Sequence, residues 1–386
     1  MDELIASDTN IDAKRKLCYV SIDSVLEGVG ASQILAYMKQ LAPKYDIHLI
    51  TMEKEQINPQ FSKEIADLGI SWTPLKFGRY GLLGGVVRLS RLFMAIDRHA
   101  IVHARSDIPA LAAALKNCKR FIWDCRALMA DQRLAIGMRK SKWIEYRILR
   151  SIERIIAFKS SRIITITNSV IELFSERYAL SPDKYVMITT CVDTNMFKKK
   201  PQQFTPQLKI LIPGTISGAY DIELMNLIIR EFRVRREVSV TVALGAGYTN
   251  LWEQIDHDVV VKKSFAEMPE LIAESNLGMS IWKESLGISL KSVASTKTAE
   301  FLSVGRPIFV NLSQGDLGSI LLNSKVGVSV SKREPENIKK YVDQMLEILD
   351  SEFSVDNCRN LAVKLFSLTN GLKVLEKLYE SLILRN

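Results

Sequence analysis

The sequence predicts an α/β protein of two doubly wound, Rossmann-like domains that face each other across a cleft. Three observations predict this fold class. Short buried strands alternate with helical stretches along the chain, as in parallel sheets covered by helices. A polar segment with two prolines, 198–206, interrupts the alternation near the middle. The same order of strand, glycine loop and helix then begins again, so the two halves predict two domains of similar size.

The first domain is predicted over residues 14–200. A strand at 16–22, a loop that holds Gly28 and Gly30, a helix over 34–41 and a strand at 46–51 are the opening of a Rossmann-like unit. Further strands are predicted at 101–104, 121–124 and 162–167.

The second domain is predicted over residues 206–371. It opens with a strand at 209–213, a loop from Gly214 to Gly218 and a helix at 221–231. Further strands are predicted at 238–244, 259–262, 278–281 and 307–311. The last segment, 372–386, contains an amphipathic helix that is expected to pack back onto the body of the protein.

The composition is that of a folded protein. Of the 386 residues, 47% are hydrophobic and 25% charged, which excludes a disordered or fibrous chain. No stretch reaches the roughly 18 apolar residues of a membrane span, and we expect no signal peptide, because the N-terminus shows no basic and then apolar run. The five cysteines and four histidines lack the spacing of disulfide frameworks or zinc sites. We therefore expect a soluble, cytoplasmic protein.

Basic residues exceed acidic ones, 52 against 43, and the net charge of +9 suggests an anionic partner. Two segments, 82–94 and 137–162, are both basic and apolar. Either they attach the protein to an anionic membrane surface, or they are core-facing helices with a solvated basic side. Nucleic acid is not expected as a partner, because aromatic residues are not interleaved with the basic ones.

The two glycine loops have two interpretations. The backbone amides around Gly28, Gly30 and Gly214 either face a phosphate at a helix N-terminus, or the glycines only permit a tight turn. Neither loop has the GxGxxG pattern, so spacing alone does not decide.

The segment 287–311 is the most informative about chemistry. Ser295 and Thr296 are helix-capping residues, and Lys297 and Glu300 lie on one face of the helix that they begin. A lysine at a helix N-terminus opposes the helix dipole, which a bound diphosphate would compensate. Glu300 would then accept hydrogen bonds from a ribose. The alternative is a solvated surface pair.

The stretch TKTAEFLSVGRP, from Thr296 to Pro307, resembles the donor site of family 4 retaining glycosyltransferases, which have the GT-B fold. Three further stretches resemble this family in the same order. Residues 24–37 are similar to its first loop and helix, 124–133 to an Asp-x-Arg segment of a bacterial polysaccharide-biosynthesis branch, and 164–169 with 190–197 to the end of its first domain. The resemblance covers about residues 17–335.

The resemblance implies transfer of a sugar, with retention, from a nucleoside-diphosphate sugar to a lipid-linked saccharide acceptor. It implies a role in bacterial surface polysaccharide or lipopolysaccharide assembly at the inner face of the cell membrane. No metal or other cofactor is expected, because a lysine and backbone amides stabilise the leaving diphosphate. The implied donor-binding residues are Gly28, Gly30, Gly214, Thr296, Lys297, Thr298 and Glu300.

The implied catalytic residues are Asp124 and Lys297. Asp124 is expected to act as a general base or sugar contact, although an aspartate at a strand end beside Arg126 is also a common structural pair. Arg105 and Arg126 are expected to hold an anionic acceptor, because both follow strands of the first domain.

The chain also departs from the family pattern. The residue eight positions before Glu300, where the family commonly has a glutamate, is Ser292, and Ser295 replaces a frequent proline. The usual basic residue is absent from the loop 214–221. Two alternatives therefore stay open: a nucleotide-sugar epimerase of the same fold, and a catalytically silent protein that binds a nucleotide sugar or acts as a scaffold.

Overall fold

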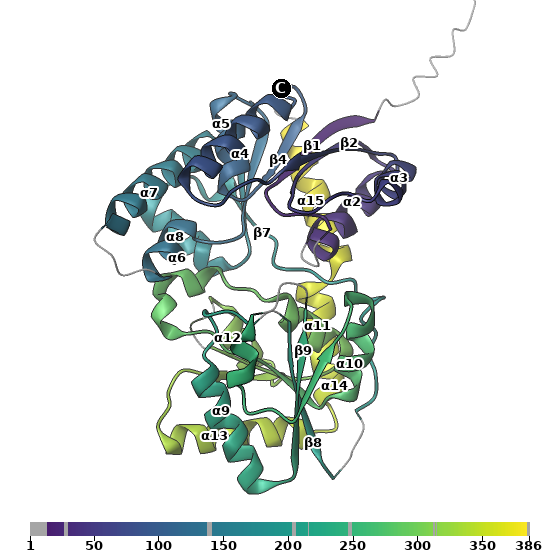
Figure 1. Ribbon diagram of the computed structural model, residues 1–386, viewed down its shortest axis with the longest axis vertical. Coiled ribbons are helices and arrows are strands. Elements are labelled where there is room, and N and C mark those ends of the chain that lie inside the picture. The colour runs from purple at the N-terminus through teal and green to yellow at the C-terminus, as the bar shows by residue number, and fades with distance from the viewer. Residues whose placement is uncertain are drawn as a thin grey trace, which may run out of the picture.

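The computed structural model contains two α/β units, each built on one parallel sheet (Figure 1). It describes residues 14–26, 30–136, 141–202, 206–214, 216–245, 249–311, 313 and 315–383. Gly28 and the start of the basic segment, 137–140, lie outside the described residues.

The N-terminal unit has a sheet of seven described strands in the order β3-β2-β1-β4-β5-β6-β7. The order reverses beside β1, so the C-terminal ends of β1 and β4 flank the switch point where doubly wound sheets bind ligands. The strands are β1 (Arg15–Ser21), β2 (Tyr45–Glu53), β3 (Ile70–Lys76), β4 (Ile101–Arg105), β5 (Phe121–Cys125), β6 (Arg162–Thr165) and β7 (Tyr185–Met187).

Helices cover both faces of this sheet, and alternate residues of β1 therefore enter two different apolar clusters. Cys18 and Val20 pack towards α4, α5, α7 and α8, whereas Leu17 and Tyr19 pack towards α2 and the last helix. The helices are η1 (Ala31–Leu35), α2 (Ala36–Leu41), α3 (Pro59–Asp67), α4 (Leu82–Ala95), α5 (Asp107–Leu115), α6 (Met129–Ile136), α7 (Ser141–Lys159), α8 (Asn168–Tyr178) and η2 (Pro182–Lys184).

The C-terminal unit repeats this plan with six described strands in the order β10-β9-β8-β11-β12-β13. The strands are β8 (Leu208–Pro213), β9 (Val238–Leu244), β10 (Val259–Lys262), β11 (Leu277–Ser280), β12 (Ile308–Asn311) and β13 (Gly327–Val330). The helices are α9 (Ile222–Arg235), η3 (Asn250–Gln254), η4 (Phe265–Glu267), α10 (Met268–Glu274), η5 (Glu284–Ser292), α11 (Thr296–Val304), α12 (Leu317–Asn323), α13 (Pro335–Asp350), α14 (Ser354–Leu361) and η6 (Ala362–Phe366).

The last helix, α15 (Leu368–Ile383), leaves the C-terminal unit and returns to the N-terminal one (Figure 1). Its apolar face joins the cluster that contains Leu17 and Ile34. The segment 372–386 was expected to pack on the body, and its described part, to 383, covers one face of the first sheet.

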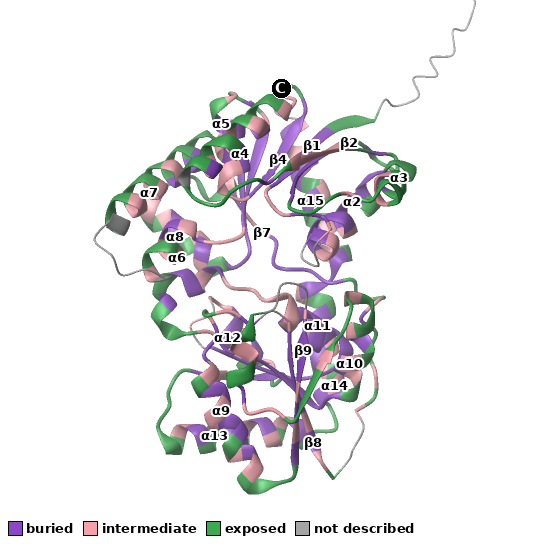
Figure 2. Cartoon of the chain, viewed as in Figure 1, coloured by how far each residue is buried: buried purple, intermediate pink, exposed green. Residues whose placement is uncertain are grey.

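The predicted fold class, two doubly wound Rossmann-like units, is confirmed. Figure 2 shows the buried strands at the centre of each unit and the exposed outer sides of the helices. Three strands, β3, β7 and β13, were not predicted. β3 contains Pro74, which an edge strand tolerates because one side of its backbone has no partner. β7 and β13, at three and four residues, are too short for a recognisable apolar run.

Candidate donor and acceptor sites

The helix predicted at Lys297 is present as α11. The Oγ of Ser295 accepts a hydrogen bond from the backbone N–H of Lys297 (3.3 Å), and Gly305 ends the helix at φ +95°. Thr296 and Lys297 are half-buried, whereas Thr298 and Glu300 are buried. The helix therefore begins with two partly accessible residues and turns the next ones inwards.

Lys297 lies directly against Gly214, which follows the first strand of the C-terminal unit. A Cβ atom on Gly214 would lie 2.8 Å from Lys297 Cε and 2.9 Å from its Nζ, and the glycine has φ +92°. A side chain at position 214 would have to displace the end of the Lys297 side chain and would be strained at this φ angle. The structure thus brings together two residues that the sequence had assigned to the donor site.

Lys297 is a cation without a carboxylate partner within the described part of the chain. Burial alone would lower the pKa of Lys297, but Tyr220 and then Glu300 raise it above its usual value. Its Nζ lies 5.9 Å from the ring centroid of Tyr220, which stacks on Trp282 at 4.9 Å. The ammonium is therefore charged at neutral pH and available to an anion.

Glu300 shares this site but is not paired by contact. It is 7% exposed, and burial raises its pKa to about 7 although the charge of Lys297 lowers it. The interpretation of Lys297 and Glu300 as a solvated surface pair is therefore wrong. The carboxyl group titrates near neutrality and is able to donate as well as accept a hydrogen bond.

A second charged centre surrounds Asp124 at the end of β5. Its Oδ1 lies 2.7 Å from Arg126 Nε, and its Oδ2 lies 3.2 Å from His103 Nε2 and 3.5 Å from Arg105 Nη1. Burial would raise the pKa of Asp124, but Arg126, His103 and Arg105 together hold it well below its usual range. A carboxylate stabilised in this way is a weak base, which favours the structural interpretation of Asp124.

Arg105 and His103, two residues of the charged centre at Asp124, make further contacts outside it. Arg105 Nε lies 2.9 Å from Asp23 Oδ2, so Arg105 bridges two carboxylates and is buried. Burial lowers the pKa of His103, and the neutral ring donates from Nε2 to Asp124 while Nδ1 accepts from Tyr379 Oη at 2.8 Å. Arg105 is consequently occupied by protein partners and poorly placed to hold an acceptor.

Arg126, unlike Arg105, has two terminal guanidinium nitrogens that are not used in ion pairs among the described residues. Its side chain is 16% exposed and, among the described residues, its ion pair to Asp124 uses Nε alone. The two terminal nitrogens of the guanidinium are left for an anion, in the planar arrangement that suits phosphate or carboxylate.

The first glycine loop is held by a buried carboxylate. Glu53 accepts hydrogen bonds from Ser24 Oγ, from Thr51 Oγ1 (2.5 Å) and from the backbone N–H of Val25 (3.2 Å). A Cβ atom on Gly30 would lie 1.9 Å from the carbonyl oxygen of Ser24. Gly30 is therefore required by the tight turn, whatever its role towards a ligand.

Several site residues were missed by sequence reasoning. His103 lies two positions before Arg105 on β4, so the alternation of strand side chains places both on one face. Tyr220 follows the loop already singled out at Gly214. Tyr379 has no local indicator, because its contact with His103 joins residues 276 apart.

Comparisons with known proteins agree with this architecture. Residues 30–196 match the family model of Glycosyltransferase Family 4. A glycosyltransferase from Rickettsia africae ESF-5 superposes with a TM-score of 0.68 at 15% identity, covering 97% of this chain and 100% of that chain. The fold is GT-B.

Two further GT-B structures are similar over nearly the whole chain. Anabaena Alr3699/HepE, in complex with UDP and glucose, has a TM-score of 0.67 at 12% identity and covers 96% of this chain and 100% of its own. WaaG, a glycosyltransferase involved in lipopolysaccharide biosynthesis, has a TM-score of 0.64 at 11% identity, with 95% and 99% covered. No curated protein sequence matches the chain.

None of the described helices is long and apolar enough to cross a membrane. In the same part of the chain, no three His, Cys, Asp or Glu residues gather where they could hold a metal ion.

Proposed function

We propose that this GT-B protein transfers a sugar from a nucleoside-diphosphate sugar to a saccharide acceptor, with retention at the anomeric carbon. The observation that carries the proposal is the ammonium of Lys297, which has no carboxylate partner among the described residues and is held against Gly214 at the N-terminus of α11. Such an arrangement suits a diphosphate, because the helix dipole and the lysine both favour negative charge there.

Catalysis in this proposal is electrostatic. The bond between the anomeric carbon and the diphosphate oxygen breaks, the acceptor oxygen bonds to the same face of the sugar, and the acceptor proton passes to the leaving phosphate. Lys297 stabilises the charge that develops on the leaving group, so the step requires no metal. Glu300, the acidic group of this site, contacts the ribose.

The acceptor is proposed to carry an anionic group that Arg126 binds, while Asp124 orients Arg126 and Arg105. Replacing Arg126 by alanine should raise the KM for the acceptor and leave the affinity for the nucleotide unchanged. Unchanged acceptor kinetics would remove Arg126 from the site.

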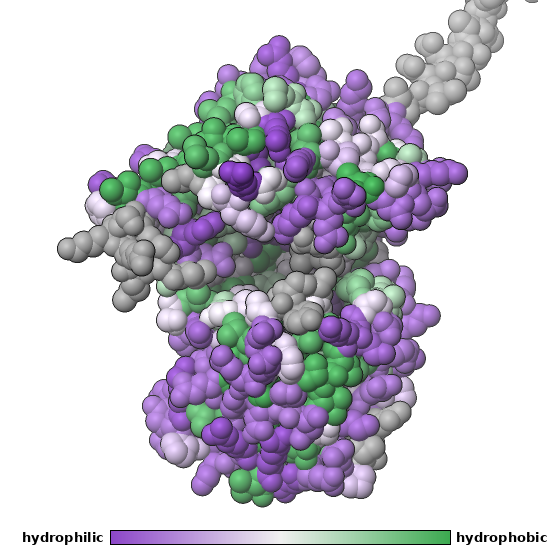
Figure 3. Space-filling model, viewed as in Figure 1, coloured by the Kyte–Doolittle hydropathy of each residue, from purple (hydrophilic) through white to green (hydrophobic). Residues whose placement is uncertain are grey.

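We also propose that the acceptor is lipid-linked and that the protein works at an anionic membrane surface, in bacterial surface polysaccharide or lipopolysaccharide assembly. Apolar side chains are exposed on α4 and α7, among them Leu83 (86%), Met94 (72%) and Ile144 (63%). Figure 3 shows hydrophobic residues gathered over this part of the N-terminal unit. The exposed charged side chains described on α7 are Arg147, Arg154 and Lys159, all basic. Helix α5 contacts both α4 and α7, so the described parts of the segments 82–94 and 137–162 lie on either side of it.

A catalytically silent nucleotide-sugar-binding protein is the second candidate. The observation that favours it is Ser292, a short hydroxyl side chain where the family commonly has a glutamate. Turnover of a nucleotide-sugar donor by the purified protein separates the two candidates. An epimerase would instead convert the donor without any acceptor.

Nucleotide binding is the first test. Thermal unfolding should be followed with UDP, GDP, ADP, CMP and their common sugar conjugates, for the wild type, Lys297→Ala and the control Lys340→Ala on the exposed face of α13. A ligand at about 100 times its Kd adds roughly 2.7 kcal/mol to the free energy of unfolding. We expect one nucleotide to raise the Tm of the wild type and control but not of Lys297→Ala. Equal shifts in all three proteins, or none, would contradict the proposal.

A further inference from the structure

The two units are joined by hydrogen bonds at residues 291–294, which comprise the last two residues of η5 and the two residues that follow it, just before α11. Three groups of the N-terminal unit, from the connections that follow β5, β6 and β7, donate to this segment. The bonds are Thr167 Oγ1 to Lys291 O (2.6 Å), Leu128 N to Ser292 Oγ (3.1 Å) and Thr190 Oγ1 to Ala294 O (2.6 Å). We call residues 291–294 the latch segment.

The residues of the N-terminal unit that make the latch contacts are buried, whereas Lys291 and Ala294, whose carbonyl oxygens accept two of the bonds, are half-buried. Leu128, Thr167, Thr190 and Ser292 are all buried, with Ser292 only 6% exposed. The Oγ of Ser292 is used twice, because it accepts from Leu128 and donates to Ser289 O at 2.9 Å. A hydroxyl with both functions occupied within the protein has little capacity left for a sugar.

A second contact lies beside the latch segment. The backbone N–H and side-chain amide of Asn168 donate to Asp316 Oδ2 at 3.3 and 3.0 Å. Gly315, with φ +54°, approaches so closely that a Cβ atom would lie 2.8 Å from Lys291 O. Residues 315–316 therefore add a second contact between the two units next to the latch segment.

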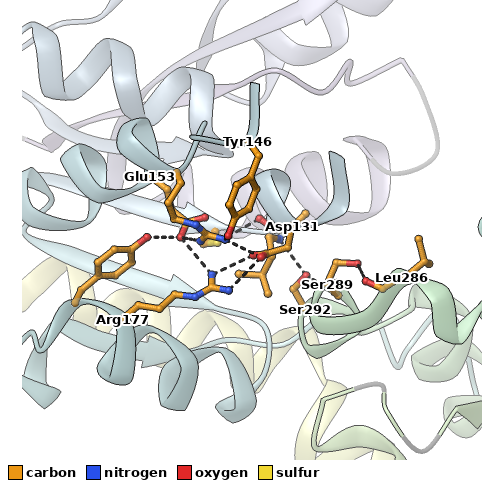
Figure 4. Close-up of polar contacts among 12 residues, drawn as sticks. Asp131, Tyr146, Glu153, Arg177, Leu286, Ser289 and Ser292 are labelled. Atoms are coloured by element: carbon orange, nitrogen blue, oxygen red, sulfur yellow. Dashed lines mark hydrogen bonds and ion pairs between the residues drawn. The ribbon is translucent and has the colours of Figure 1, made fainter. Parts of the chain in front are cut away.

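An ionic cluster in the N-terminal unit holds the helix that follows Leu128 in place. Leu128 immediately precedes α6, and Asp131 on that helix pairs with Arg150 of α7 (2.7 Å) and Arg177 of α8 (3.0 Å). Figure 4 shows this ionic cluster next to the contact between Leu128 and Ser292. Because the cluster ties α6, α7 and α8 together, it fixes the position from which the Leu128 N–H is presented.

We infer that Ser292 is a positioning residue that sets the donor helix against the acceptor-binding unit. Lys297 follows the latch segment by three residues, so the latch determines where the ammonium lies relative to Arg126. A glutamate at 292 is two carbons longer, and its carboxylate could not donate to Ser289 O as Ser292 Oγ does. Ser292 thus makes an inter-unit contact at the position where the family commonly has a glutamate. The kinetic part of this inference rests on the proposed function, but the latch itself does not.

The inference is tested with Ser292→Ala, with Ser292→Thr to restore the hydroxyl, and with Ser289→Ala as a matched control. Ser289 is a buried serine of the same helix, and its Oγ donates to Leu286 O within the C-terminal unit (Figure 4). Hydrogen exchange of the Leu128 amide reports on the latch without any substrate. Steady-state kinetics on the donor that the nucleotide panel identifies reports on positioning.

In Ser292→Ala we expect the Leu128 amide to exchange at least about tenfold faster, because its acceptor is gone. We expect kcat to fall roughly ten- to a hundredfold at unchanged donor KM, because α11 is misplaced and not disrupted. Ser292→Thr should restore both and Ser289→Ala should change neither. Unchanged Leu128 exchange in Ser292→Ala would overturn the latch, even for a protein that turns over no donor. Faster exchange with unaltered kcat would overturn the positioning role.

Discussion

Tyr379, in the last helix of the chain, lies 2.8 Å from Nδ1 of His103 in the first sheet. His103 is hydrogen-bonded in turn to Asp124, and Asp124 is paired with Arg126. The orientation of the proposed acceptor-binding arginine thus depends on a helix that enters the N-terminal unit only after the chain has completed the other one.

Tyr379→Phe should lower the free energy of unfolding by about 1–3 kcal/mol, because the buried Nδ1 of His103 loses its donor. Urea denaturation measures this change. Tyr45→Phe is the control, since Tyr45 packs edge-on against Tyr379 at 5.5 Å and its hydroxyl has no hydrogen bond among the described residues. Equal losses in both variants would mean that packing, and not the bond to His103, explains the effect.

Gly214→Ala should impair both stability and nucleotide binding. A left-handed backbone with a side chain costs about 1–3 kcal/mol. The new Cβ would lie 2.9 Å from Lys297 Nζ and would therefore displace the ammonium. Differential scanning fluorimetry with and without the identified nucleotide measures both effects. Gly218→Ala is the matched control, because a Cβ there meets nothing within 4 Å. A Gly214→Ala protein that binds the nucleotide like the wild type would remove this contact from the donor site.

The sequence predicts only in part that Gly214 and Lys297 are neighbours. Doubly wound topology places the loop after β8 and the helix before β12 at the same edge of the sheet, so Gly214 and Lys297 were both assigned to one site. Their van der Waals contact depends on a φ angle of +92°, which no spacing pattern encodes. The latch contact between Leu128 and Ser292 spans 164 residues and depends on how two units dock, so local periodicity carries no information about it.

Glu300 should make the stability of the protein fall as pH rises. Its folded-state pKa, about 7, lies above the value of 4.5 expected when unfolded, so the native state binds more protons between these values. The loss amounts to roughly 3 kcal/mol on passing from pH 4.5 to 7. Glu300→Gln cannot ionise and should therefore gain stability relative to the wild type at pH 8 but not at pH 4.5.

Guanidinium denaturation at the two pH values measures this difference. Glu336→Gln, on an exposed part of α13, is the control and should show no pH-dependent gain. A Glu300→Gln protein whose stability follows the wild type at both pH values would show that the carboxyl group is ionised freely in the native state.

Membrane attachment should depend on the exposed apolar stripe of α7. Ile144→Glu combined with Ile148→Glu replaces two exposed side chains on one face of the helix and adds negative charge beside Arg147. We expect wild-type protein to float with vesicles containing phosphatidylglycerol, less so at high salt, and the double variant to remain unbound. Val234→Glu, at an apolar residue 82% exposed on the other unit, should bind like the wild type. Equal flotation of all three proteins would place the membrane contact elsewhere.

Arg306→Lys should destabilise the C-terminal unit and its connection to the linker, the segment 198–202 that leads from the N-terminal unit. The Arg306 side chain is fully buried and donates to the carbonyl oxygens of Lys200, Pro201, Ala273, Ser275 and Gly305. Burial lowers its pKa to about 10, yet the planar group stays charged and satisfies all five acceptors. A lysine has a single ammonium that cannot reach both the linker and the loop before β11.

We expect the lysine variant to lose about 2–4 kcal/mol, the sum of several buried bonds to a charged donor, and residues 198–202 to become sensitive to protease. Arg230→Lys is the control, because Arg230 is exposed and makes only a long contact of 4.0 Å, from its Nε to Asp256 Oδ2, the one carboxylate near it among the described residues. If Arg306→Lys kept the Tm of the wild type but exposed the linker to cleavage, the guanidinium would act on the linker alone. If neither changed, the five carbonyls would have to be satisfied by water, and the buried arginine would not hold the linker to the sheet.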